Sequence, residues 1–89
     1  MEVKMAQKRI LVVDDEPKLV EMLTMRFQAN GYKVITACDG EQGLRKARKS
    51  RPDLIVLDII MPKMQGDTMA QALKDDEESR GIPIIFLTC

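Results

Sequence analysis

The chain has 89 residues, with 14 basic and 14 acidic side chains, no histidine and three aromatic residues. This length limits it to one domain. Its formal net charge of zero argues against a nucleic-acid binder held by bulk positive charge. A hydrophobic content of 45% excludes a disordered segment. Because histidine is absent, any phosphoryl or proton chemistry of this chain must use carboxylates, lysines or hydroxyls.

The sequence carries no sign of secretion or of a membrane span. Its longest early apolar run, residues 10–13, is too short for a signal peptide or a transmembrane helix. The two cysteines, Cys38 and Cys89, fit no metal or disulfide pattern. We therefore expect a cytoplasmic protein without membrane contact, and we expect Cys38 to be a small buried hydrophobic residue.

The first half of the chain predicts two strands and one long helix. Residues 1–7 are polar and are expected to form a loose segment. Residues 10–13 (ILVV) form an apolar run without alternation, which is typical of a parallel strand buried on both faces. A helix begins at Pro17, a residue suited to the first helical position, and ends at the Asn30–Gly31 pair. The short run at residues 34–35 predicts an edge strand.

The second half of the chain also predicts helices and strands in alternation. We expect a helix over residues 41–49, a buried strand over residues 54–57 (LIVL) and a third helix over residues 67–75. A last strand covers residues 82–87, with Pro83 at its entry. This order of strands and helices predicts an α/β fold with a doubly wound parallel sheet and right-handed crossovers.

The second predicted helix has a basic flank. Four basic residues lie within the helix and a fifth lies just after it: Arg45, Lys46, Arg48, Lys49 and Arg51. A solvated outer helix face is the simpler interpretation of these charges. The alternative is a docking surface for an acidic partner.

Polar side chains follow the predicted strands where ligands bind in such sheets, beyond the carboxyl ends. Asp14 and Asp15 follow the first strand, Asp58 follows the third and Thr88 follows the fourth. Two carboxylates about 5 Å apart repel by roughly 3 kcal/mol at an effective dielectric constant of 20. If the first and third strands are neighbours, three carboxylates meet there and favour a bound cation such as Mg²⁺. Each aspartate alone has a simpler interpretation, as a helix cap or a turn residue.

Three stretches of this sequence resemble the receiver domain of two-component response regulators. They are ILVVDDEP at 10–17, LIVLDIIMPKMQG at 54–66 and IPIIFLT at 82–88. The most specific part is the apolar strand that ends in Asp58 and is followed by Met61, Pro62 and Gly66. The resemblance covers residues 8–89 and implies a flavodoxin-like sheet. Gly66 is expected to supply a backbone conformation that a side chain would hinder.

The resemblance implies a role for each candidate site residue. Asp58 would accept a phosphoryl group from a phosphohistidine and form an acyl phosphate. Asp15 would bind Mg²⁺ directly, Asp14 more often through water, and the backbone carbonyl of Ile60 would complete the protein ligands. The hydroxyl of Thr88 would contact the phosphoryl group and act as a switch.

The function implied is a phosphoacceptor module in two-component signal transduction, or phosphorelay. Its partner would be a sensor histidine kinase or a phosphotransfer protein, and it would not bind nucleic acid. It would not be an enzyme with turnover on a free substrate, and would catalyse at most its own phosphorylation and dephosphorylation. We discount a phosphatase with an aspartyl nucleophile, because Ile60 stands two residues after Asp58 where that class has an acid.

The sequence departs from the family in its extent. A receiver has five strands and five helices in sheet order 2-1-3-4-5, whereas four strands and three helices are predicted here. We therefore expect a receiver truncated after the fourth strand, in order 2-1-3-4, without the fifth strand, its lysine and the last two helices. The fourth strand would become an exposed apolar edge. The alternative function is a non-signalling fragment that self-associates through this strand, at Ile84, Ile85, Phe86 and Leu87.

Overall fold

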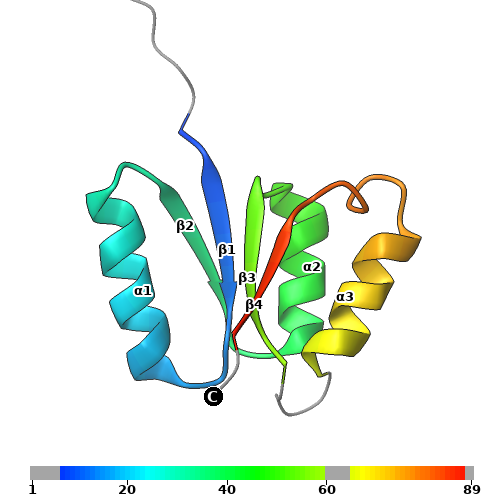
Figure 1. Cartoon of the computed structure of the whole chain (residues 1–89), viewed down its shortest axis with the longest axis horizontal. Helices are drawn as coiled ribbons and strands as arrows, with labels where there is room; N and C mark the ends of the chain where they lie inside the picture. The colour runs from blue at the N-terminus through cyan, green and yellow to red at the C-terminus, as the bar shows by residue number, and fades with distance from the viewer. Residues whose placement is uncertain (1–6, 60–64, 88–89) are drawn as a thin grey trace, which may run out of the picture.

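The computed structural model describes residues 7–59 and 65–87, which form one parallel sheet with helices on both faces (Figure 1). The strands are β1 (Arg9–Val13), β2 (Lys33–Ala37), β3 (Leu54–Asp58) and β4 (Ile84–Leu87). The helices are α1 (Pro17–Ala29), α2 (Gly40–Ser50) and α3 (Gly66–Asp75). The strand order is β2-β1-β3-β4, and all three pairings are parallel. The predicted doubly wound α/β fold and its strand order are confirmed. Of the segment expected to be loose, residues 1–6 lie outside the described residues.

The central strand β1 is buried on both faces, which explains why its sequence does not alternate. Its residues Leu11 and Val13 belong to a core shared with α2 and α3. Its residues Ile10 and Val12 belong to a smaller core under α1. Each face therefore needs apolar side chains, and the strand reads as a continuous apolar run.

The two cores differ in size. The larger one consists of Leu11, Val13, Ala37, Ala47, Ile55, Leu57, Met69, Ala70 and Leu73. The smaller one consists of Ile10, Val12 and Val56, with half-buried residues of α1 packed against them. In Figure 1, α1 lies alone on one side of the sheet, and α2 and α3 lie together on the other.

Helix α1 begins and ends close to the predicted positions. Pro17 is its first residue, and the side chain of Glu16 caps it by accepting a hydrogen bond from the Lys18 N–H at 3.3 Å. The chain leaves the helix through Gly31, whose φ of 88° lies in the left-handed region that glycine tolerates. The cap is therefore Glu16, and neither of the two preceding aspartates has that role.

Helix α2 lies close against the sheet because small residues face the core. Gly40, Gly43 and Ala47 are its buried residues. A Cβ placed on Gly43 would lie 3.0 Å from side-chain atoms of Met69 and Val13.

Strand β2 is longer than its apolar run predicts, and β4 is shorter. Strand β2 has five residues and pairs with β1 along its whole length, from Lys33 opposite Arg9 to Ala37 opposite Val13. It lies at the edge of the sheet, as predicted. Strand β4 begins at Ile84, after the proline.

The prediction that Cys38 is buried is wrong. Cys38 is exposed, whereas its neighbour Ala37 is buried at the end of β2. The reason is that the strand ends at Ala37. Cys38 lies in the turn before α2, where its N–H donates to the Oε1 of Gln42 at 2.9 Å. Among the described residues, no helix combines the length and the apolar character that crossing a membrane requires.

Candidate functional site

Three acidic residues converge where β1 and β3 end. Asp14 directly follows β1, and Asp58 is the last residue of β3. These strands are neighbours, with Val13 opposite Leu57, so both aspartates arrive at the same edge of the sheet. One carboxylate oxygen each of Asp14, Asp15 and Asp58 lies within 4.8 Å of the other two. The structure thus brings together three predicted site residues, which we call the acidic cluster.

The other two predicted site residues, Ile60 and Thr88, lie outside the described residues. Met61 and Pro62 also lie outside them. Strand β4 ends at Leu87, which pairs with Asp58, so the chain before Thr88 runs beside the cluster.

Asp14 is the buried member of the acidic cluster. It is only 3% exposed, whereas Asp15 is exposed and Asp58 is half-buried. The backbone N–H of Asp14 donates to the carbonyl of Ala37 at 3.1 Å, which ties the start of the loop to β2. Its Oδ1 accepts a hydrogen bond from the N–H of Glu16 at 2.9 Å. This second contact orients the carboxylate and was not foreseen from the sequence.

Burial raises the pKa of Asp14 above its usual value, and the hydrogen bond from Glu16 offsets part of that rise. The negative charges of Asp58 and Asp15 raise this pKa further. The folded protein therefore holds a carboxylate in a place that disfavours its charge. A cation bound between the three side chains would remove both the repulsion and much of the burial cost.

The donor set of the acidic cluster fits a hard divalent cation. All three side chains offer carboxylate oxygens, the ligands preferred by Mg²⁺ and Ca²⁺ over softer sulfur or nitrogen. Mg²⁺ also keeps several of its waters. The exposed Asp15 leaves a solvent side on which those waters fit. A surface hollow beside the cluster, lined by Asp14, Asp15, Thr36 and Cys38 among others, connects it to solvent.

Gly66 is required next to the cluster, for a reason that differs from the prediction. The φ of Gly66 is not in the left-handed region, so its dihedral angles suit other residues. A Cβ at this position would collide with the backbone carbonyl oxygen of Asp58 and lie 2.8 Å from the Cα of Ile59. The N–H of Gly66 also donates to the carbonyl of Ile59 at 2.7 Å. The first turn of α3 therefore lies directly against the backbone that carries Asp58.

The family model for the response regulator receiver domain matches residues 10–89. The chain belongs to this family. The receiver is 46% identical over 81 residues to the alkaline phosphatase synthesis transcriptional regulatory protein PhoP of Bacillus subtilis. That match covers 91% of this chain and 33% of PhoP. It is 45% identical over 80 residues to the response regulator PleD of Caulobacter vibrioides, covering 90% of this chain and 18% of PleD. The receiver thus spans a third or less of these relatives.

Solved structures show the same architecture. The receiver superposes with a TM-score of 0.89 and 38% identity on the N-terminal domain of a response regulator receiver protein from Methanoculleus marisnigri JR1. It superposes with a TM-score of 0.89 and 32% identity on the receiver domain of a sensor histidine kinase from Pseudomonas aeruginosa PAO1. Each match covers 93% of this chain and 68% of the other. The second structure has a magnesium ion coordinated in its active site cleft.

Proposed function

We propose that this receiver accepts a phosphoryl group on Asp58 from the phosphohistidine of a sensor kinase or phosphotransfer protein, with Mg²⁺ in the acidic cluster. The observation that carries the proposal is the convergence of three carboxylates within 4.8 Å in a receiver fold. Asp14 and Asp15 would hold the ion together with Asp58. The carbonyl of Ile60 and the hydroxyl of Thr88 would complete the site, by resemblance to the family.

The transfer needs one nucleophile and strong charge neutralisation. A carboxylate oxygen of Asp58 attacks the phosphorus, and the new P–O bond forms as the P–N bond to the imidazole breaks. The electron pair of that P–N bond stays on the imidazole nitrogen, which takes up a proton. Bound Mg²⁺ would supply the positive charge that balances the phosphoryl oxygens.

The surroundings of the cluster support this division of roles. Asp58 is half-buried at the strand end, where an incoming donor can reach it. Asp14 is buried, its backbone N–H donates to Ala37 and its Oδ1 accepts from the N–H of Glu16, which suits a residue that holds a cation in place. Rigid positioning of this kind is the main protein contribution to phosphoryl transfer.

Intact-mass measurement after incubation with Mg²⁺ and acetyl phosphate tests the proposal. We expect the wild-type chain to gain one phosphoryl group. The Asp58→Asn variant should gain none, and wild type should gain none when Mg²⁺ is removed by chelation. An unmodified wild-type chain, or a phosphoryl adduct that persists in Asp58→Asn, contradicts the proposal.

Asp53→Asn is the matched control for this experiment. Asp53 precedes β3 and lies at its opposite end, where its Oδ2 accepts a hydrogen bond from the Arg9 N–H at 2.8 Å. Asparagine retains an acceptor oxygen for that bond. This variant should therefore be phosphorylated like wild type.

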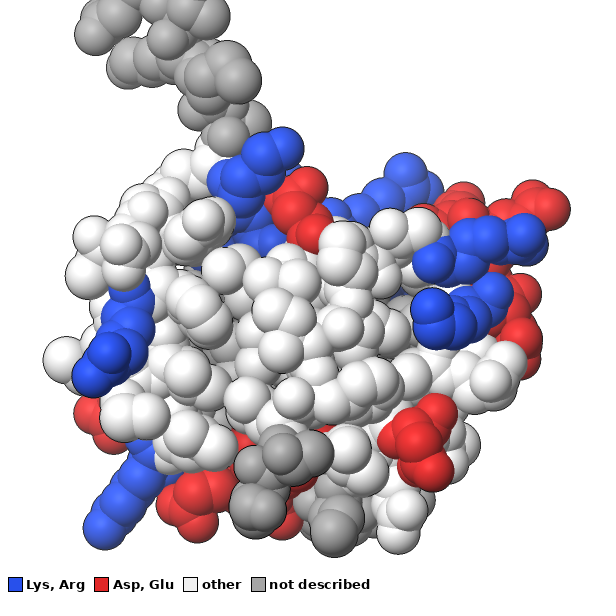
Figure 2. Space-filling model, in the orientation of Figure 1, with Lys and Arg blue, Asp and Glu red and all other residues white. Residues whose placement is uncertain are grey.

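A second candidate function is self-association through β4, and the exposure of this strand favours it. Ile85 and Phe86 are 50% and 43% exposed on an edge strand. Figure 2 shows the face on which β4 lies, with an uncharged middle and the charged side chains around its margin. An apolar edge without charge is a template for pairing with another chain.

Sedimentation velocity distinguishes this second function. The wild-type chain should form dimers or larger species, and Phe86→Lys should shift it to monomer. Met25→Lys is the control, because Met25 is a 64% exposed apolar residue of α1, away from the edge. A wild-type chain that is monomeric at every concentration would exclude self-association while leaving phosphorylation of Asp58 untouched.

A further inference from the structure

Helix α2 concentrates positive charge in a chain whose net charge is zero. Its eleven residues include four cations and one carboxylate, Glu41. The cations are Arg45, Lys46, Arg48 and Lys49, and Arg51 follows at the helix end. The sequence left open whether these side chains form a solvated face or a docking surface.

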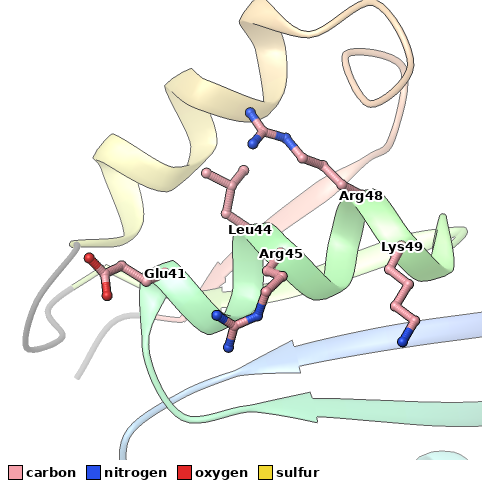
Figure 3. Close-up of a pocket in the computed structure, with 5 residues that line it drawn as sticks. All are labelled: Glu41, Leu44, Arg45, Arg48 and Lys49. Carbon is pink, nitrogen blue, oxygen red and sulfur yellow. The ribbon is translucent and has the colours of Figure 1, made fainter.

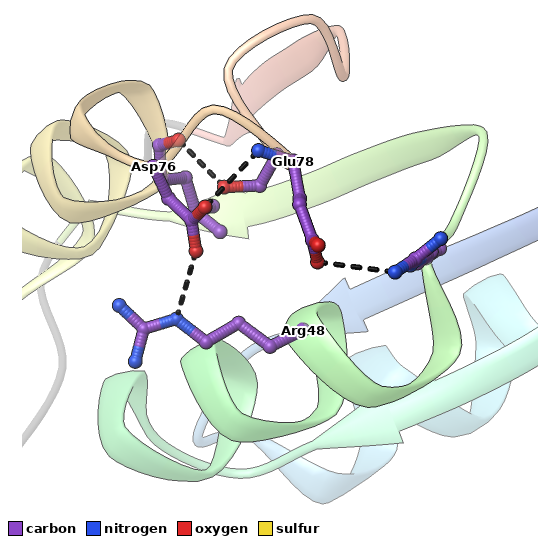
Figure 4. A network of polar contacts seen from close by, with 6 residues as sticks. Arg48, Asp76 and Glu78 are labelled. Atoms are coloured by element: carbon purple, nitrogen blue, oxygen red, sulfur yellow. Dashed lines mark hydrogen bonds and ion pairs between the residues drawn. The ribbon is translucent and has the colours of Figure 1, made fainter.

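Three of these cations already have partners within the chain. The Nε of Arg48 lies 3.4 Å from the Oδ2 of Asp76, and Figure 4 shows this pair between α2 and the turn after α3. In the same network, Arg51 lies 3.1 Å from a carboxylate oxygen of Glu78. The ammonium of Lys46 donates to the carbonyl of Thr36 at 2.6 Å. These contacts join α2 to neighbouring elements, and they give Lys46, Arg48 and Arg51 partners within the chain.

Arg45 and Lys49 are different. Both are exposed, and neither forms an ion pair or a side-chain hydrogen bond within residues 7–59 and 65–87. They are four residues apart on one helix, so they stand one turn from each other on the same face. Figure 3 shows both side chains directed away from α3, whereas Leu44 and Arg48 are directed toward it. We call this pair the Arg45–Lys49 ridge.

The ridge separates two surface hollows, and each has an apolar wall. On the α3 side, the ridge residues line a hollow together with Leu44, Arg48 and Glu41. On the β2 side, the same two residues line a second hollow with Ile35. Unpaired positive charge therefore stands between two hollows, each of which has one apolar residue in its lining, Leu44 or Ile35. This combination suits a ligand that carries both negative charge and an apolar side chain.

We propose that the Arg45–Lys49 ridge binds an acidic helical segment of a partner protein. Carboxylates at positions i and i+4 of such a segment match the one-turn spacing of the two cations. An apolar side chain from the segment fills one of the adjoining hollows, against Leu44 or Ile35. Such an anchor supplies affinity that exposed ion pairs alone do not give.

Acidic protein suits this surface better than nucleic acid. Among the described residues of α2, Arg45 and Lys49 are the two cations without a partner, and a protein that contacts two phosphates gains little from counterion release. Carboxylates border the surface, with Glu41 at the start of α2 and Asp76 and Glu78 beyond Arg48. A continuous phosphate backbone would run into these negative charges, whereas a short peptide fits between them.

Fluorescence anisotropy with a labelled synthetic peptide tests the proposal on the full 89-residue chain. The probe is a helical peptide with glutamates at i and i+4 and one leucine on the same face. We expect measurable binding that weakens as salt is added. Replacing the glutamates with glutamine should abolish binding, and replacing the leucine with serine should weaken it. Binding should not require Mg²⁺ and should survive Asp58→Asn, so it can succeed or fail independently of phosphorylation.

Charge reversal on the protein gives the decisive comparison. The double variant Arg45→Glu/Lys49→Glu should lose about tenfold or more in affinity. Lys74→Glu is the control for the single reversal Lys49→Glu, because Lys74 is an exposed lysine in the last turn of α3, as Lys49 is in the last turn of α2. It should leave affinity within about twofold of wild type, since screening weakens distant charges.

Three results would overturn the proposal. The first is no binding of the glutamate peptide. The second is an equal loss of affinity in Lys74→Glu, which would indicate an unspecific charge effect. The third is tighter binding of an oligothymidine that the double variant also abolishes, which would assign the ridge to nucleic acid.

Discussion

The close approach of α3 to the backbone of Asp58 makes Gly66→Ala a sensitive test of the site. Helix propensity predicts that alanine is better than glycine by about 0.5–1 kcal/mol inside a helix. The structure predicts the opposite, because the added methyl group would collide with the carbonyl oxygen of Asp58 and crowd Ile59. The atoms it meets are backbone, so no side chain can rotate away.

The expected cost follows from this overlap. Inserting a methyl group into a filled space typically costs about 1–3 kcal/mol. Because the overlapped atoms are backbone, the cost should lie in the upper part of this range, about 2–3 kcal/mol. After the propensity gain, we expect Gly66→Ala to lower the free energy of unfolding by about 1–2.5 kcal/mol. For a domain of this size, each kcal/mol shifts the Tm by about 4–8 °C, so the Tm should fall by roughly 4–20 °C. The displaced Asp58 should also weaken any stabilisation by Mg²⁺.

Gly81→Ala provides the control in the same urea and thermal unfolding experiments. A Cβ on Gly81 meets no atom within 4 Å, and its φ is not left-handed. This change should leave stability unchanged or raise it by about 0.4–1 kcal/mol through the unfolded chain. If Gly66→Ala proves as stable as Gly81→Ala, the close packing of α3 on the Asp58 backbone is refuted.

The remaining predictions concern ionisation, cation binding and a buried hydroxyl. Because the pKa of Asp14 is raised from 3.8, its protonation stabilises the folded state below that value. The stability gained from this protonation is lost as the pH rises through the pKa of Asp14 in the folded protein. Metal-free Asp14→Asn should therefore be more stable than wild type near neutral pH. In urea titrations, this difference in the free energy of unfolding should shrink toward about pH 4. Mg²⁺ at about 100 times its Kd should stabilise wild type by about 2.7 kcal/mol in thermal unfolding, and Asp58→Asn should lose most of this gain; an equal gain in both would place the ion elsewhere. Ser79→Ala should cost about 0.5–1.5 kcal/mol, because the buried Ser79 hydroxyl donates to the carbonyl of Leu73 at 2.6 Å, and that carbonyl keeps the Asp76 N–H as a second donor. A loss no larger than that of Ser50→Ala, whose hydroxyl lies at a half-buried helix end, would contradict this.

The parts of the fold that depend on local pattern were predictable from the sequence. The apolar runs of β1 and β3 located the buried strands, since both faces of these strands require apolar residues. Pro17 and the Asn30–Gly31 pair marked the ends of α1 through backbone chemistry that is local to the chain. Two acidic residues follow one strand and a third follows another, so the strand order implied by the family resemblance was enough to predict that they meet.

What the sequence did not predict depends on distance in space. A glycine was expected at position 66, but the physical reason for it is close contact with the backbone of Asp58, eight residues earlier, which helix and turn propensities do not include. Arg45 and Arg48 are both arginines of α2, and of the two only Arg48 forms an ion pair within the described residues. The reason is that the turn after α3, which carries Asp76, lies close to one side of α2. Cys38 was misplaced because its burial depends on the residue at which β2 ends.

The unequal cores have a consequence for hydrogen exchange. None of the thirteen residues of α1 is buried, whereas α3 contributes fully buried Met69 and Leu73 to the larger core. Amide protons of α1 should therefore exchange through local openings of lower free energy than those of α3. Helix α1 begins two residues after Asp15, so a cation bound by Asp14 and Asp15 would stabilise its first turn. Slower amide exchange in α1 would then indicate that the acidic cluster holds a cation, although the amides that report it do not contact the ion.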